Sequence, residues 1–179
     1  MRARHPLLVA IIASTSCLGL QSRAAAGDLE TAGTLVLIAL PATSGALNVA
    51  HRDGQGAKQL ATSLVVTAGL TMALKYAISE TRPIGGEHSF PSGHAALAFS
   101  AAECMYARYG WQCGAPAIAA ASFVAYSRVA SRQHYVHDVV AGAVIGVASS
   151  ALLTKPYKGR KAAMLGERGA VVVGVWRCW

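Results

Sequence analysis

After its first 26 residues, this 179-residue chain has four stretches that carry no charged side chain over 15 to 20 consecutive residues, and they constrain the fold more than any other feature. They are residues 31–50, 59–74, 113–127 and 139–154. A fifth stretch, residues 93–109, is interrupted by Glu103 and Arg108. Charged residues make up 13% of the chain, against about 25% in an average soluble domain. Because an uncharged helical face is poorly suited to water, this pattern predicts membrane-embedded or deeply buried helices.

The uncharged stretches are rich in Ala, Gly and Ser, which let helices pack closely in a membrane and also occur in tightly packed soluble helices. A spanning helix needs about 20 apolar residues, and most of these stretches are shorter. We therefore expect an all-α fold, a bundle of five or six helices that is transmembrane, with a soluble bundle as the alternative. The valine-rich C-terminal segment, residues 158–179, is expected to form a short β-hairpin or a tail.

The first 26 residues have the order of an export signal. A basic start with Arg2 and Arg4 precedes an apolar run, and three alanines at positions 24–26 stand before Gly27. This order predicts a signal peptide, residues 1–26, and the alternative is an uncleaved first membrane helix. Either version sends a helical domain, residues 27–157, into an export pathway.

The net charge of the chain is +8, with 16 basic and 8 acidic residues. Removing residues 1–26 takes away three arginines and no acidic residue, which leaves 13 basic and 8 acidic residues and a net charge of +5. A modest basic excess suits anionic lipids and phosphate substrates. The chain has no arginine-rich run and no zinc-finger spacing, so nucleic acid is not expected as a partner.

The basic residues also predict an orientation. If residues 31–50 enter the membrane from the outside, then Arg52, Lys58, Arg108 and a basic cluster within residues 155–161 fall on the inner side. The same alternation puts residues 75–94 and 128–138 together on the outer side. We therefore expect a protein of the bacterial cytoplasmic membrane whose site faces the periplasm, with a soluble periplasmic protein as the alternative.

Three short motifs occupy those two outer stretches. They contribute Lys75 and Arg82 in KYAISETRP, His94 in PSGH, and Arg128, His134 and Asp138 in SRVASRQHYVHD. Taken singly, each has an ordinary structural explanation, such as cations at a helix end or a helix start. Together they bring three cations into a poorly solvated place, and such a place requires an anion. A tetrahedral phosphate with several charged oxygens meets that requirement.

The order K-x6-RP, PSGH and SR-x5-H-x3-D resembles the three-part signature of the type 2 phosphatidic acid phosphatase and vanadium haloperoxidase superfamily, matched without a gap. The resemblance implies that His134 is a nucleophile that forms a phosphohistidine. Asp138, one helical turn further on, is then expected to orient and stabilise the His134 imidazole. His94 is expected to act as the general acid that protonates the leaving oxygen.

The same resemblance implies that Lys75, Arg82 and Arg128 bind the phosphoryl oxygens. PSGH is expected to place Ser92 and Gly93 at a helix start, where main-chain N–H groups and the helix dipole bind phosphate. No cofactor is implied. No HExxH or paired CxxC spacing indicates a metal site, so no metal ligand is assigned.

The expected activity is metal-independent hydrolysis of a lipid phosphate: phosphatidic acid, phosphatidylglycerophosphate, a polyprenyl diphosphate or a lipid A-type glycolipid. The alternatives are a soluble periplasmic non-specific acid phosphatase, a vanadate-dependent haloperoxidase and a non-catalytic phospholipid-binding protein. A pure binding protein has no need of a nucleophile with an orienting acid, and the haloperoxidases are much longer chains. His88 and His137 are expected near the mouth of the site without an assigned role, and the sequence specifies no oligomeric state.

Overall fold

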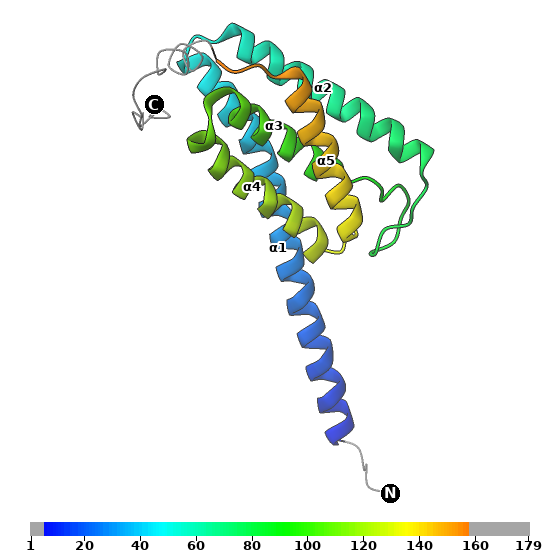
Figure 1. Ribbon diagram of the computed structural model, residues 1–179. Coiled ribbons are helices and arrows are strands. Elements are labelled where there is room, and N and C mark those ends of the chain that lie inside the picture. The colour runs from blue at the N-terminus through cyan, green and yellow to red at the C-terminus, as the bar shows by residue number, and fades with distance from the viewer. Residues whose placement is uncertain (1–5, 158–179) are drawn as a thin grey trace, which may run out of the picture.

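The computed structural model describes the backbone of residues 6–157 and the side chains of residues 26–157. The helices of the described chain are α1 Pro6–Ala50, α2 Gly54–Ala77, α3 Gly93–Tyr109, α4 Trp111–Ala130 and α5 Val136–Leu153 (Figure 1). Residues 6–157 contain no strand, and the predicted all-α bundle is confirmed. The hairpin or tail predicted for residues 158–179 lies outside the described residues. The predicted cleavage site after Ala26 falls within α1 and stays a prediction.

Helix α3 is the centre of the bundle and packs against each of the other four helices. Its small side chains allow this, and the fully buried alanines among them are Ala95, Ala96, Ala98, Ala101 and Ala102. On α5, Gly142 packs against the carbonyl oxygen of Ser92, and Gly146 against that of Ala96. A Cβ at either glycine would overlap the oxygen that it faces. The glycines therefore let α5 approach the start of α3 at backbone distance.

Apolar and polar side chains are arranged in the opposite way from a water-soluble bundle. Large apolar side chains on the exterior include Leu35, Val65, Val144 and Leu152. Buried hydroxyl-bearing side chains include Ser44, Ser63, Thr67 and Ser100. The segments long and apolar enough to cross a bilayer are Ala26–Ala50, Gly54–Ala77 and Val136–Leu153. An apolar exterior of this kind is stable in lipid rather than in water, so we treat the bundle as a membrane protein.

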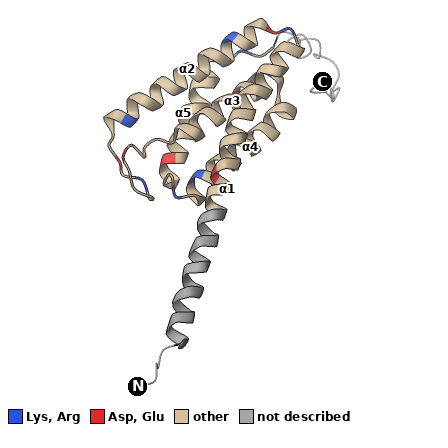
Figure 2. Ribbon diagram, turned by 180° about the vertical axis from the view of Figure 1, so that it is seen from behind, with Lys and Arg blue, Asp and Glu red and all other residues tan. Residues whose placement is uncertain are grey.

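The connections between helices separate the bundle into two ends. The α2–α3 connection, residues 78–92, and the α4–α5 connection, residues 131–135, lie at one end, which we call the site end (Figure 1). The α1–α2 and α3–α4 turns lie at the other, which we call the turn end. Charged residues mark both ends of α2, and the middle of that helix is uncharged (Figure 2). The fold thus brings residues 75–94 and 128–138 together, as the alternation of crossings predicts.

Candidate active site

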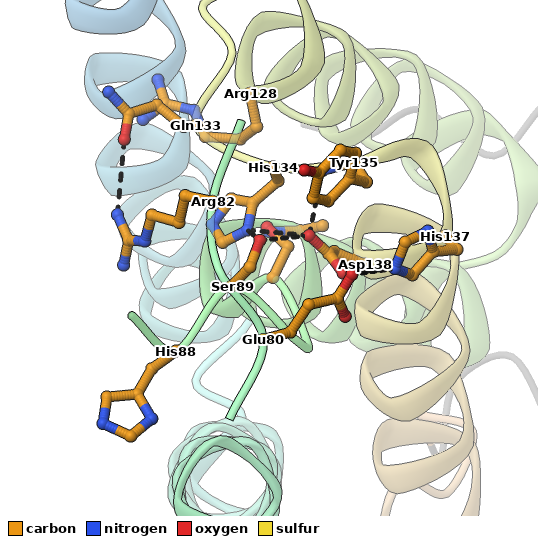
Figure 3. Close-up of polar contacts among 12 residues, drawn as sticks. Glu80, Arg82, His88, Ser89, Arg128, Gln133, His134, Tyr135, His137 and Asp138 are labelled. Carbon is orange, nitrogen blue, oxygen red and sulfur yellow. Dashed lines mark hydrogen bonds and ion pairs between the residues drawn. The ribbon is translucent and has the colours of Figure 1, made fainter. Parts of the chain in front are cut away.

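The site end gathers the side chains of all three sequence motifs. Lys75 comes from the last turn of α2, Arg82 from the following connection, His94 from the first turn of α3 and Arg128 from the last turn of α4. His134 comes from the α4–α5 connection, and Asp138 from the first turn of α5. Figure 3 shows Ser89, His134 and Asp138 meeting at the centre of the site, with the Arg82 guanidinium beside them and turned toward Gln133. The predicted convergence of the motifs is therefore present in the structure.

His134 and Asp138 form the buried centre of the site. His134 Nδ1 lies 3.5 Å from Asp138 Oδ2. Helix α5 begins only at Val136, so the expected spacing of one helical turn is wrong as a description of this pair. Asp138 instead caps the helix, accepting the Tyr135 N–H at 2.9 Å. The capping contact, rather than helical periodicity, holds the carboxylate beside the imidazole.

Ser89 holds the same carboxylate from the α2–α3 connection. It is fully buried, and its hydroxyl donates to Asp138 Oδ2 at 2.5 Å and lies 3.5 Å from His134 Nδ1 (Figure 3). Its main chain is fixed too, because its N–H donates to the Glu80 carbonyl oxygen at 2.8 Å. Ser89 is not among the site residues predicted from the sequence. A serine just ahead of PSGH carries no signal until the fold places it against a residue 49 positions away.

The electrostatic environment keeps the His134 imidazole neutral. Its pKa is lowered to about 4, first by burial and then by the positive charges of Lys75 and Arg82, against the opposing effect of Asp138. Since Nδ1 faces Asp138, the proton of the neutral ring is assigned to Nδ1. Nε2 has no hydrogen-bond partner among the described residues and is left with a free lone pair.

Lys75 and Arg82 are held by neutral oxygen acceptors. Lys75 Nζ donates to the carbonyl oxygens of His88 at 2.7 Å and Ser89 at 3.4 Å. Arg82 Nη1 donates to the Gln133 side-chain oxygen at 3.3 Å (Figure 3). Neither cation forms an ion pair with a carboxylate among residues 26–157. Their charges are therefore positioned without being neutralised.

Arg128 is buried and points toward α1. Its guanidinium donates to the carbonyl oxygen of Glu30 and, at 3.2 Å, to the Ser127 hydroxyl. The Glu30 carboxylate lies 3.7 Å from Arg128 Nη1, and its other oxygen accepts from Gln133 Nε2 at 3.1 Å. Glu30 and Gln133 were absent from the predicted site. Gln133 adjoins His134 in the sequence, whereas nothing in the sequence around Glu30 indicates its contact with α4.

The PSGH motif starts α3 as expected, and its residues divide between structure and site. Gly93 is the first helical residue and Ser92 is the N-cap, with its hydroxyl accepting from the Ala95 N–H at 3.5 Å. Ser92 is fully buried, and its own N–H donates to the Asp138 carbonyl oxygen at 2.9 Å. The predicted phosphate contacts of Ser92 and Gly93 stay predictions.

His94 faces the cations of the site. Burial lowers its pKa, and the charges of Arg128, Arg82 and Lys75 lower it further, with Glu30 opposing them. The ring has no hydrogen-bond partner among the described residues. A bound anion would oppose these effects and raise the pKa of His94.

One group of side chains at this end has the composition of a metal site. Within the described residues, ligand atoms of Glu80, His137 and Asp138 all lie within 4.8 Å of one another. His137 was expected near the mouth of the site or facing solvent; its side chain is 58% exposed, and its ring is stacked on Tyr135. The sequence predicted no metal ligands, and Glu80 was not among the expected site residues.

Comparison with known proteins relates the whole arrangement to one family. The sequence model of the PAP2 superfamily matches residues 84–161 of this chain. The chain is 37% identical over 138 residues to the lipid A 4'-phosphatase of Helicobacter pylori strain J99, covering 70% of each chain. It is 34% identical over 91 residues to the lipid A 1-phosphatase of Porphyromonas gingivalis, covering 49% of this chain and 20% of that protein.

Two crystal structures have a similar fold. LpxE of Aquifex aeolicus superposes with a TM-score of 0.59 at 23% identity, covering 84% of this chain and 87% of that one. A transmembrane PAP2-type phosphatidylglycerolphosphate phosphatase of Bacillus subtilis superposes with a TM-score of 0.59 at 19% identity, covering 93% and 82%. At these identities the likeness supports the helical bundle itself.

Proposed function

The chain belongs to the PAP2 superfamily, and from this membership and the geometry of the site we propose that it removes phosphate from a lipid A-type glycolipid in the bacterial membrane. The observation that carries the proposal is a neutral imidazole at His134, backed by the buried carboxylate of Asp138. Unneutralised charges of Lys75 and Arg82 lie beside it. Phosphoryl transfer through a covalent intermediate requires a nucleophile, a residue that orients it, and positive charges around the phosphoryl group.

In the first half of the reaction, His134 Nε2 attacks phosphorus and the P–O bond to the lipid breaks. The electron pair of that bond goes to the leaving oxygen, which takes a proton from His94 and departs as the lipid alcohol. The phosphorylated imidazole keeps its proton on Nδ1, where Asp138 stabilises the positive charge that the ring acquires. Lys75, Arg82 and Arg128 stabilise the charge on the transferring phosphoryl oxygens.

In the second half, water hydrolyses the phosphohistidine. His94, now neutral, takes a proton from the attacking water, and the P–N bond breaks. The electron pair of that bond returns to Nε2 of His134, and inorganic phosphate leaves. His94 then carries the proton that the next turnover needs, so both histidines return to their starting states.

One consideration supports a lipid A-type substrate over the other expected lipid phosphates, and two more support a membrane lipid in general. The relatives with the highest identity reported above are both named as lipid A phosphatases. The bundle exposes apolar side chains, as a protein with a membrane substrate does. The site lies at one end of the bundle (Figure 1), and the ends of membrane-spanning helices are where lipid headgroups meet water.

The test of the activity is phosphate release by the full chain purified in detergent. The substrates are lipid A, phosphatidic acid, phosphatidylglycerophosphate, a polyprenyl diphosphate and a soluble chromogenic monoester, with His134→Ala as the matched control. We expect lipid A to be the best substrate of the wild-type protein and no release by the variant. A clear preference for another lipid would overturn the substrate assignment, and equal activity of both proteins would overturn the nucleophile.

We also propose that residues 27–157 form the phosphatase domain and that the site end faces the periplasm. Support comes from Arg52, Lys58 and Lys155 at the turn end, which suits the cytoplasmic side. A cysteine introduced at Glu87, which is exposed, is expected to react with a membrane-impermeant maleimide in intact spheroplasts. One introduced at Lys58 should react only after lysis. The reverse pattern would invert the orientation, and release of the protein by carbonate washing would contradict the membrane location.

A further inference from the structure

A second functional group lies on the face of Asp138 that is turned away from His134. His137 Nε2 lies 2.9 Å from Glu80 Oε1 and 3.1 Å from Asp138 Oδ1 (Figure 3). Glu80 comes from the α2–α3 connection, whereas His137 and Asp138 come from the first turn of α5. Two carboxylates from separate segments therefore converge on a single imidazole nitrogen.

A single hydrogen on His137 Nε2 cannot serve as the hydrogen-bond donor to both carboxylates. Nε2 carries at most one hydrogen, which the Glu80 carboxylate accepts at 2.9 Å. Asp138 Oδ1 has no hydrogen-bond partner among the described residues. The Asp138 side chain is 0% exposed, so water does not reach this oxygen either. The other oxygen, Oδ2, is already occupied by Ser89 and by the Tyr135 N–H. A buried carboxylate oxygen without a hydrogen bond is rare and costly, and it is directed at two other metal-ligating groups.

We propose that Glu80, His137 and Asp138 bind one Zn²⁺ ion, and that this ion inhibits the enzyme. One imidazole and two carboxylates are ligands that zinc prefers, at about 2.0–2.2 Å, and a tetrahedral site sets its ligand atoms roughly 3.3 Å apart. The separations of 2.9 and 3.1 Å from His137 Nε2 need only a small expansion to reach that spacing, and the Glu80 and Asp138 oxygens lie within 4.8 Å of each other. His137 and Glu80 side chains are 58% and 31% exposed, so an ion can enter from solvent and keep a water as its fourth ligand.

Inhibition follows from the position of the site and rests on the proposed function. The ion would bind Oδ1, on the opposite side of the carboxylate from His134, so it does not reach the phosphorus. It would draw negative charge from Asp138, which is then less able to stabilise the phosphorylated His134 ring. The ion thus acts on the nucleophile through its orienting residue.

The experiment uses the full chain in detergent, with Zn²⁺ as the probe and a chromogenic chelator as competitor. The variants are His137→Ala and Glu80→Gln. The matched control is His88→Asn, because His88 is also at the site end and Asn tolerates its positive φ of 59°. We expect both variants to bind Zn²⁺ at least about tenfold more weakly than the wild type, and the control to bind equally. Equal binding by all four proteins would overturn the site.

Phosphate release measured in parallel separates this inference from the proposed function. Zinc is expected to inhibit the wild type and the His88→Asn control, while His137→Ala and Glu80→Gln keep their activity at the same zinc concentration. Equal inhibition of all four proteins would contradict the mechanism proposed for the ion. Absence of phosphate release from zinc-free wild type would contradict the proposed function instead, because the binding comparison does not depend on any substrate.

Discussion

Arg108 at the turn end and Arg128 at the site end are both buried, yet their surroundings differ in one decisive respect. Arg108 forms two hydrogen bonds to the Asp53 carboxylate, and both side chains are 4% exposed. It also donates to the Gln59 side chain and the Lys155 carbonyl oxygen, each at 2.7 Å. The Asp53 carboxylate therefore neutralises the charge of Arg108, and most of its N–H donors have acceptors within the fold.

Arg128 is 2% exposed, but its carboxylate neighbour Glu30 is 40% exposed and 3.7 Å away. Its closest acceptors are neutral, as they are for Lys75 and Arg82. A buried cation paired closely with a carboxylate contributes to the integrity of the fold, whereas a group of buried and partly buried cations with neutral acceptors retains affinity for an anion. The ion-pair partner, rather than burial, therefore distinguishes a structural arginine from a ligand-binding one.

The sharpest difference between the two ends is expected from His134→Ala. Removing the nucleophile should lower phosphate release by at least about 10⁴-fold, because the remaining groups cannot form the phosphohistidine. The measurement is the rate of phosphate release from one lipid substrate, the same for both proteins. Thermal unfolding of the detergent-solubilised protein is the control for folding. A variant that unfolds like the wild type yet keeps more than a tenth of the activity would contradict the assignment.

Arg108→Met tests the turn end. It leaves Asp53 buried without its partner and should lower the free energy of unfolding by about 3–5 kcal/mol. The measurement is thermal unfolding in detergent. The double variant Asp53→Leu with Arg108→Met removes both charges and is expected to recover most of the loss. An unfolding temperature of Arg108→Met equal to that of the wild type would break the distinction between the two arginines.

Arg128→Lys tests the site end in the same way. The charge is kept but the planar fork of donors is lost, so kcat/KM should fall by about 10²–10³-fold. The unfolding temperature is expected to change little, because the half-exposed Glu30 carboxylate can be hydrated when its partner moves. A large loss of stability with full activity would make Arg128 a structural residue like Arg108.

The pH dependence of activity should report the site-end histidines alone. His134 must be neutral to attack, so kcat/KM is expected to fall about tenfold per pH unit below its pKa of about 4. His94 must be protonated, and its pKa lies below the ordinary value of about 6.5, so activity is expected to fall as pH rises through that lowered value. An acidic optimum in a pH–rate profile would agree with both directions, and a rate still rising at pH 8 would contradict the role of His94.

Ser89→Ala should give the smallest effect. The hydroxyl does not reach phosphorus but fixes Asp138 Oδ2 at 2.5 Å, so its loss should lower kcat by about tenfold and leave KM unchanged. The measurement is a full saturation curve with the preferred lipid substrate, and Thr67→Val, which changes a buried hydroxyl outside the site, is the control. A change in KM with unchanged kcat would show that Ser89 contacts substrate instead.

The site was predictable where the sequence itself carries the chemistry. Lys75, Arg82, His94, Arg128 and His134 were all expected, because each is an ionisable group in an apolar context and belongs to a motif with defined spacing. Residues such as Ser89, Gln133 and Glu30 escaped prediction. A serine, a glutamine or a helix-borne glutamate is common at any surface, and its role depends on which distant atom it meets.

Three features can be predicted without any structure: the membrane-compatible helices, the alternation that brings the motifs to one end, and the identity of the ionisable groups. These properties depend on the order of residues along the chain, which charge, hydropathy and spacing express directly. Two features become visible only in the folded chain. Asp138 caps α5 instead of lying one turn after His134 on the same helix, and Ser89 and Glu80 approach it from the α2–α3 connection. The physical reason is that contacts across 49 or 98 residues, as between Ser89 and Asp138 or Glu30 and Arg128, are set by how closely helices with small side chains pack.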